Sequence, residues 1–267
     1  MHDVCMLNND NYFSAEAQKA YWGASMYKDF AKCEAAAMAR INGEFDQEET
    51  VALLVGSYID AHFSGEMREF LRDHPTIFTR NGTLRAEYRQ ADEIIERIER
   101  DVMMLGYLEG EKQRIMTGRI CGIPFKIKMD AYIPDKRIVD LKIMRDMEPV
   151  YLPGEGKVPF WRAWGYDKSM AIYQEGEWQN RGGEKLPCYL AVATKQTPSD
   201  IAIIQLDQVI LDNALLEVQA DIETLDLVKR GEVEPVRCEK CAYCRSTKIL
   251  TAPVSASMLM EQDAIVF

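Results

Sequence analysis

Apolar residues in the first hundred positions recur every three or four residues, which is the spacing of one buried face of an α-helix. Ser25 is a suitable N-cap residue at the start of the first such stretch, and Ile94, Ile95 and Ile98 line one side of the last. The pattern predicts three helices, over about 25–43, 48–72 and 85–105.

The middle of the chain instead alternates apolar and polar residues with the two-residue period of a β-strand. This alternation predicts strands over about 116–120, 125–132, 137–143, 188–194 and 201–206. The stretch 149–159 contains three prolines and two glycines, so we expect a loop there. Further helical patterns lie at about 164–175 and 207–229.

This order of elements predicts an α/β fold in which a central mixed sheet is flanked by helices. A chain of 267 residues is long enough for one large domain. We therefore expect a single domain over 1–267, with the leading helices and the sheet core at 21–207. A C-terminal helix and a cysteine-rich tail would follow at 208–250.

The composition is that of an ordinary globular protein, with 47% hydrophobic and 28% charged residues. The first residues, MHDVCMLNNDNYF, lack the basic start and apolar stretch of a signal peptide, and no apolar run is long enough to cross a bilayer. Seven cysteines, three of them close together near the end, do not resemble a secreted disulfide framework. We expect a cytoplasmic protein without a membrane partner.

The net charge of −11 disfavours nucleic acid as a partner when it is taken alone. The charge is uneven, however, because residues 118–168 contain ten Lys or Arg against seven Asp or Glu. A locally basic region on an acidic body is compatible with DNA binding.

The stretch KIKMDAYIPDKRIVDLKI reads as two strands joined by a turn, and it contains Asp130, Asp140 and Lys142. Because strand side chains alternate between faces, Asp140 and Lys142 point the same way, and pairing around the turn places Asp130 beside them. Carboxylate oxygens are preferred ligands of hard divalent cations, and a nearby lysine can orient an attacking water. This set suits phosphodiester hydrolysis. An exposed hairpin with a surface ion pair is the alternative on spacing alone.

The pattern Asp130-x9-Asp140-Leu141-Lys142 resembles the PD-(D/E)XK nuclease superfamily, and within it the RecB-like and phage RecE-like exonucleases. Four further segments agree with this resemblance in chain order, which extends it over about 21–248: GSYIDAHFSGE, TGRICGIPFKIKMD, WGYDKSMAIYQE and CYLAVATKQTPSDIAIIQLD.

The resemblance implies a DNA exonuclease that depends on Mg²⁺ or Mn²⁺ and acts on duplex ends in phage-type recombination. It implies catalytic roles for Asp130, Asp140 and Lys142, and a metal shell completed by His62 and the Leu141 carbonyl. By the same resemblance, a single-strand annealing protein is an expected partner and a trimer or tetramer an expected assembly.

Residues outside the catalytic triplet are expected to contact the substrate. Tyr173 matches the tyrosine of the family's Gln-x-x-x-Tyr helix, whereas Ser169 stands where glutamine is usual. Lys195 and Gln196 follow an apolar strand, where Lys195 is either a phosphate contact or a surface lysine.

Three other functions stay open at this level. The first is an endonuclease on the same fold, and the second is an iron–sulfur nuclease that processes DNA ends. The third belongs to another class, a non-catalytic DNA-binding protein. A histidine such as His62, taken alone, is more often a structural, hydrogen-bonded residue than a metal ligand.

The spacing Cys238-x2-Cys241-x2-Cys244 lets several thiolates reach one metal centre, and Cys33 is the best candidate for a fourth ligand. One early and three late cysteines resemble the iron–sulfur staple of some RecB-like nucleases, which implies a [4Fe-4S] cluster. Zinc is the alternative, and free thiols in a reducing compartment are a third interpretation.

Overall fold

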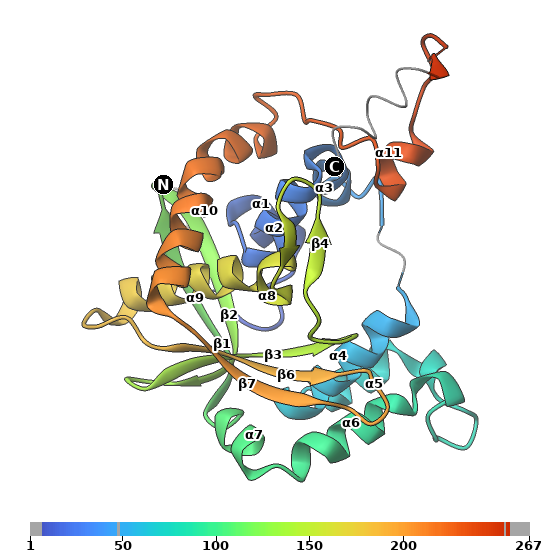
Figure 1. Ribbon diagram of the computed structural model, residues 1–267, viewed down its shortest axis with the longest axis vertical. Coiled ribbons are helices and arrows are strands. Elements are labelled where there is room, and N and C mark those ends of the chain that lie inside the picture. Colours follow the sequence, from blue (N-terminus) through green and yellow to red (C-terminus); the bar gives the residue numbers. More distant parts are fainter. Residues whose placement is uncertain (1–6, 47–48, 254, 257–267) are drawn as a thin grey trace.

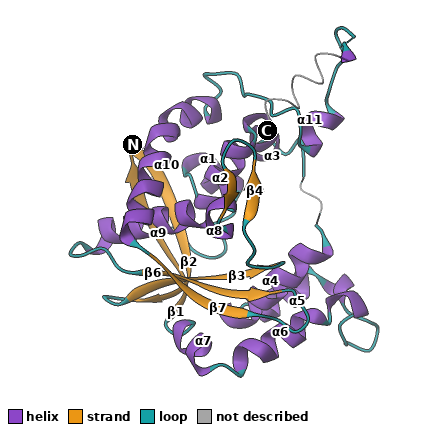
Figure 2. Cartoon of the chain, in the orientation of Figure 1, coloured by secondary structure: helices purple, strands orange, loops and turns teal. Residues whose placement is uncertain are grey.

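The computed structural model describes residues 7–46, 49–253 and 255–256, in which helices cover both faces of a central five-stranded sheet (Figures 1 and 2). The strand order is β1-β2-β3-β6-β7, and only the β3–β6 pair is parallel. The predicted α/β fold with a mixed sheet is therefore confirmed. The strands are β1 (Glu111–Ile120), β2 (Ile123–Ile133), β3 (Arg137–Met144), β6 (Cys188–Thr194) and β7 (Ile201–Leu206).

Two groups of helices form the outer layers. The helices of one layer are α1 (Ala15–Ala20), α2 (Ala24–Lys32), α3 (Glu34–Ile41), α8 (Phe160–Ala163), α9 (Tyr166–Arg181) and α10 (Gln208–Lys229). Those of the other are α4 (Val51–Ser64), α5 (Met67–Asp73), α6 (Gln90–Glu99) and α7 (Val102–Tyr107). Short helical elements complete the set: η1 (Pro75–Ile77), η2 (Ala86–Tyr88) and α11 (Ala242–Ser246).

The apolar alternation of the strands divides the core between these layers. On β6, Leu190 and Val192 pack with α9 and α10, whereas Ala191 and Ala193 pack with α4 and α6. All four side chains are completely buried, because β6 lies inside the sheet and is covered on both faces. The predicted bounds of β6 and β7 match those of the structure, and on β6 the run of buried residues ends with the strand at Thr194.

The structure corrects four of the predicted elements. The helix predicted over 25–43 breaks at Cys33, whose backbone is extended, and that predicted over 48–72 ends at Gly65 in a left-handed cap. Asp101 starts a new helix within 85–105 by accepting a hydrogen bond from Met104 N–H. The stretch 149–159 forms a hairpin of β4 (Val150–Leu152) and β5 (Gly156–Val158) instead of a loop.

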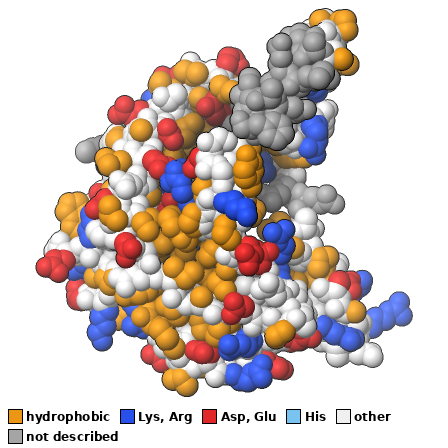
Figure 3. All heavy atoms as spheres, in the orientation of Figure 1, with side chains coloured by type: hydrophobic (Ala, Val, Ile, Leu, Met, Phe, Trp, Pro, Cys, Tyr) orange, Lys and Arg blue, Asp and Glu red, His pale blue; other side chains and the backbone are white. Residues whose placement is uncertain are grey.

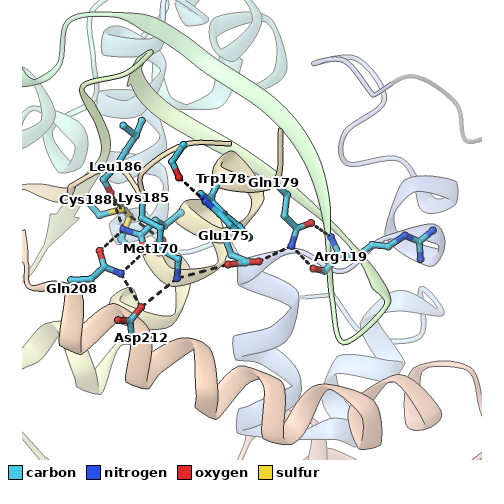
Figure 4. A network of polar contacts seen from close by, with 12 residues as sticks. Arg119, Met170, Glu175, Trp178, Gln179, Lys185, Leu186, Cys188, Gln208 and Asp212 are labelled. Atoms are coloured by element: carbon cyan, nitrogen blue, oxygen red, sulfur yellow. Dashed lines mark hydrogen bonds and ion pairs between the residues drawn. The ribbon is translucent and has the colours of Figure 1, made fainter. Parts of the chain in front are cut away.

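A polar network fixes α9 against the sheet and against α10 (Figure 4). The Gln179 side chain accepts a hydrogen bond from Arg119 N–H at 2.8 Å and donates one to the Arg119 carbonyl at 2.7 Å. Lys185 then bridges α9 to α10 through ion pairs with Glu175 and Asp212. This anchoring matters because α9 carries Tyr166 and Tyr173 toward β2 and β3.

Acidic and basic side chains are interspersed over the face drawn in Figure 3, so the net negative charge does not form one acidic field there. Within the part of the chain that the structure describes, no helix is long and apolar enough to span a membrane.

The glycine before β1 supplies a test of this fold. Gly110 has φ +113°, and a Cβ there would overlap the carbonyl oxygen of Tyr132. We expect Gly110→Ala to lower the free energy of unfolding by about 1–3 kcal/mol. Gly106→Ala, in α7 with open space around it, should raise it by about 0.5–1 kcal/mol. Urea denaturation measures both, and equal effects would contradict the assigned backbone geometry.

Candidate active site

Strands β2 and β3 form a hairpin that opens at its far end. Ile133 pairs with Arg137, Tyr132 with Ile138 and Ala131 with Val139, and backbone pairing then stops. The next pair in this register would be Asp130 and Asp140. In place of that pair, the Asp130 carboxylate accepts the Leu141 backbone N–H at 2.8 Å.

Because a side chain takes the place of the backbone acceptor, the two strands separate where the acids lie. On the other side of β2, Gln113 has φ +51° and is missing from the ladder between Lys112 and Arg114. The sheet is therefore irregular on both sides of Asp130. Backbone strain of this kind occurs often at functional sites.

Asp140 and Lys142 form an ion pair on β3, as the two-residue strand period predicts. Asp140 is only 2% exposed. Burial opposes the Lys142 ammonium, but the carboxylates of Asp140 and Asp130 outweigh it and raise the pKa of Lys142. Burial, and next the Asp140 charge, raise the pKa of Asp130 well above its usual range. The predicted convergence of Asp130, Asp140 and Lys142 is present.

A third carboxylate, which sequence reasoning missed, joins them from α4. Asp60 lines the same cleft of about 310 Å³ as Asp130, Leu141 and Lys142. Burial raises the pKa of Asp60, and the nearby Lys142 ammonium opposes that shift. A sequence signal exists, because the cleft-facing stripe of α4 is built from small residues at helical spacing: Ala52, Gly56, Ser57 and Asp60.

The structure places His62, a predicted metal ligand, outside this cleft. Its Nε2 atom lies 2.8 Å from Glu99 Oε1 on α6, and the side chain is partly exposed. Positions two residues apart on a helix differ by about 200° in direction, so His62 faces away from the cleft that Asp60 enters. His62 links α4 to α6.

The predicted substrate-contacting residues divide into two groups. Tyr173 lines a pocket beside Asp130, and Lys195 lines the acidic cleft while its ammonium donates to the Ala52 carbonyl at 2.6 Å. Ser169 instead donates its hydroxyl to the Gly165 carbonyl within α9. Gln196 accepts from the Thr194 hydroxyl and is not among the residues that line the cleft.

The four cysteines singled out by spacing do come together. The Sγ atoms of Cys33, Cys238, Cys241 and Cys244 all lie within 4.8 Å of one another. The extended residue between α2 and α3 is Cys33, so the helix break presents its thiol to the C-terminal tail. Backbone N–H groups of Lys240 and Cys241 lower the pKa of Cys238 to about 6, which favours the thiolate that metals bind.

Comparison with known proteins identifies a family for this chain. The model of a family described as a PDDEXK-like domain of unknown function matches residues 23–247. This chain belongs to that PDDEXK-like family. The predicted PD-(D/E)XK resemblance is thereby confirmed.

A crystal structure from Eubacterium rectale, described as a "Putative exonuclease", superimposes on the PDDEXK-like chain with a TM-score of 0.90. The two sequences are 46% identical, over 95% of this chain and 97% of that one. A structure described as SSO0001 aligns at a TM-score of only 0.31 and 15% identity, over 86% of this chain and 96% of that one, and carries no argument. No curated protein matches the chain.

The donor set of the PDDEXK-like site fits a hard divalent cation. It consists of oxygen atoms only: the carboxylates of Asp60, Asp130 and Asp140 and the carbonyl of Leu141. The buried Oδ2 atom of Asp140 receives no hydrogen bond of good geometry and faces only the Lys142 ammonium. Oxygen donors of this kind suit Mg²⁺ or Mn²⁺.

Metal titration distinguishes Asp60 from His62. We expect Asp60→Asn to weaken Mn²⁺ binding by at least about tenfold, because it removes a charged oxygen donor. His62→Gln should change that affinity by less than about twofold, since the ring contacts Glu99 outside the cleft. Isothermal titration with Mn²⁺ measures both. A larger loss in His62→Gln than in Asp60→Asn would reverse the assignment.

Proposed function

We propose that this protein is a divalent-metal-dependent deoxyribonuclease, an exonuclease of the phage recombination type that acts on ends of duplex DNA. The observation that carries the proposal is the convergence of three carboxylates and one ammonium where β2 and β3 separate. Membership of a PDDEXK-like family, and 46% identity to a chain described as a "Putative exonuclease", support a nuclease.

In this proposal Asp60, Asp130, Asp140 and the Leu141 carbonyl hold the cation. A bound divalent cation supplies positive charge that offsets the charge developing on the phosphate. The Lys142 ammonium, kept protonated by Asp140 and Asp130, orients the attacking water by donating a hydrogen bond. Water oxygen bonds to phosphorus, the bond to the leaving sugar oxygen breaks, and that oxygen takes up a proton. Lys195 meets the phosphate backbone at the mouth of the cleft.

The cysteine site has a structural role in this proposal, and its dimensions favour zinc over a [4Fe-4S] cluster. Cys33 Sγ lies 3.6 Å and Cys238 Sγ 3.9 Å from Cys244 Sγ. Four thiolates at the usual ~2.3 Å around one tetrahedral zinc ion lie about 3.8 Å apart. A cluster inserts iron and sulfide atoms between the thiolates and separates them further. A zinc ion there would fasten the tail to the break between α2 and α3.

Substitution of the catalytic pair tests the nuclease. We expect Asp140→Asn and Lys142→Met each to reduce hydrolysis of end-labelled linear duplex in Mg²⁺ by about 10³-fold or more, because each removes charge that acts on the phosphate. EDTA should abolish the wild-type activity. Asp135→Asn and Lys136→Met, in the exposed turn of the same hairpin, are matched controls that should keep activity within about twofold.

Two outcomes of that assay would contradict the proposal. Full activity in Asp140→Asn would exclude the assigned site. Cutting of closed circular duplex would identify an endonuclease, because an exonuclease needs an end.

Metal analysis tests the cysteine site independently of activity. We expect one zinc ion per chain, no visible charge-transfer absorbance, and loss of the zinc in Cys241→Ser. That variant should unfold more easily by more than the ~1 kcal/mol typical of a point substitution. The exposed free thiol of Cys121 provides the control, since Cys121→Ser should retain the zinc. Stoichiometric iron with a brown colour would establish the cluster instead.

A further inference from the structure

A second ammonium lies beside the catalytic lysine. Lys28, on α2, has its Nζ 5.4 Å from the centre of the Tyr166 ring, and Lys142 Nζ lies at the same distance from that ring. Twice this distance, 10.8 Å, is therefore the largest separation that the two nitrogen atoms can have. Lys28 precedes Lys142 by 114 residues, so it reaches the site from a distant segment of the chain.

The path of the Lys28 side chain depends on the absence of a Cβ atom at Gly165. Gly165 has φ +63° at the N-terminus of α9. A Cβ there would lie 3.0 Å from Lys28 Cδ and 3.3 Å from Lys28 Cγ. The left-handed backbone and this close approach both favour glycine, so α9 begins in a way that lets the lysine stem pass toward Tyr166.

Three other lysines in this region have acidic partners. Lys142 pairs with Asp140, Lys128 with Glu66 at 3.6 Å, and Lys168 with Glu217 at 2.9 Å. The Lys28 ammonium differs from these three, because it makes no ion pair with any residue that the structure describes. Lys195 in the cleft also lacks an ion pair among the described residues, but it donates to the Ala52 carbonyl.

The environment of Lys28 leaves its charge poorly compensated. Burial, and next the neighbouring Lys142 charge, lower the pKa of Lys28 to about 8, although Asp140 acts in the opposite direction. A desolvated ammonium without a close counter-ion is costly. An anion beside the Lys28 ammonium would offset both its lost hydration and its repulsion by Lys142.

We propose that Lys28 binds a non-bridging oxygen of the substrate phosphate next to the one that is hydrolysed. Phosphates follow one another at ~3.4 Å of helix axis along each strand, so a separation of at most 10.8 Å lets the two ammonium groups reach neighbouring phosphates of one strand. This inference rests on the proposed nuclease function and deepens it: Lys142 acts at the scissile phosphate, and Lys28 holds the strand in register.

Salt-dependent DNA binding tests this role against simple packing of Lys28 on Tyr166. The probe is a linear duplex, in Ca²⁺ in place of Mg²⁺ so that it stays intact. We expect Lys28→Met to weaken binding and to reduce the slope of log affinity against log salt by about one, because one phosphate contact is lost. Lys28→Arg should retain most of the affinity. Lys136→Met, in the exposed β2–β3 turn, should leave affinity and slope unchanged.

A second arm changes the DNA instead of the protein, so its first readout uses the wild-type chain. Duplexes carry one neutral methylphosphonate, moved through the terminal phosphates of each strand. We expect one position next to the cleaved bond to weaken wild-type binding, and Lys28→Met to bind that duplex and the unmodified one equally. Thermal unfolding of Lys28→Met is measured alongside, to show that the variant is folded.

The outcomes separate this inference from the function it rests on. Wild-type cleavage in Mg²⁺ together with an unchanged salt slope in Lys28→Met would overturn the role of Lys28 and leave the nuclease intact. Sensitivity to the methylphosphonate that persists in Lys28→Met would overturn it as well. A wild-type protein that neither binds nor cleaves the duplex would contradict the proposed function itself.

Discussion

The hydrogen bond from Leu141 N–H to the Asp130 carboxylate is the interaction on which the site depends. In a regular hairpin that N–H would pair with the β2 backbone, and the two strands would stay closed. Here an anion takes the place of the backbone acceptor, so the strands separate without leaving a buried donor unpaired. At this opening, Asp130 of β2 and Leu141 of β3 line one cleft with Asp60 of α4, and Asp140 pairs with Lys142 beside them.

Crowding of like charges favours the binding of a cation at the site. Burial, with the Asp140 charge acting in the same direction, raises the pKa of Asp60 and of Asp130, so these acids gain from any positive charge among them. Lys142 supplies one such charge from within the chain. A bound metal would supply more. The protein carries a net charge of −11, yet its cleft collects ammonium groups, which is the local arrangement that a phosphate backbone requires.

Sequence reasoning predicted where side chains point when the two-residue period of a strand determines it. It failed where the direction of a side chain or of the backbone depends on tertiary contacts. The two-residue strand period and the turn at 134–136 determined how Asp130, Asp140 and Lys142 meet. On α4, a family resemblance favoured His62, whereas the helical phase of the small-residue stripe brings Asp60 to the cleft. The break at Cys33 was equally hidden, because residues around it have good helix propensity and only contacts with the distant tail account for an extended residue there.

The most direct test of the central claim is the position of a bound metal ion. A crystal soaked in Mn²⁺ and measured at the manganese absorption edge locates the ion by anomalous scattering. We expect a peak within coordination distance of the Asp60, Asp130 and Asp140 carboxylates and the Leu141 carbonyl, at the point where β2 and β3 separate. A peak bound by His62, or one outside this cleft with the cleft empty, would contradict the account.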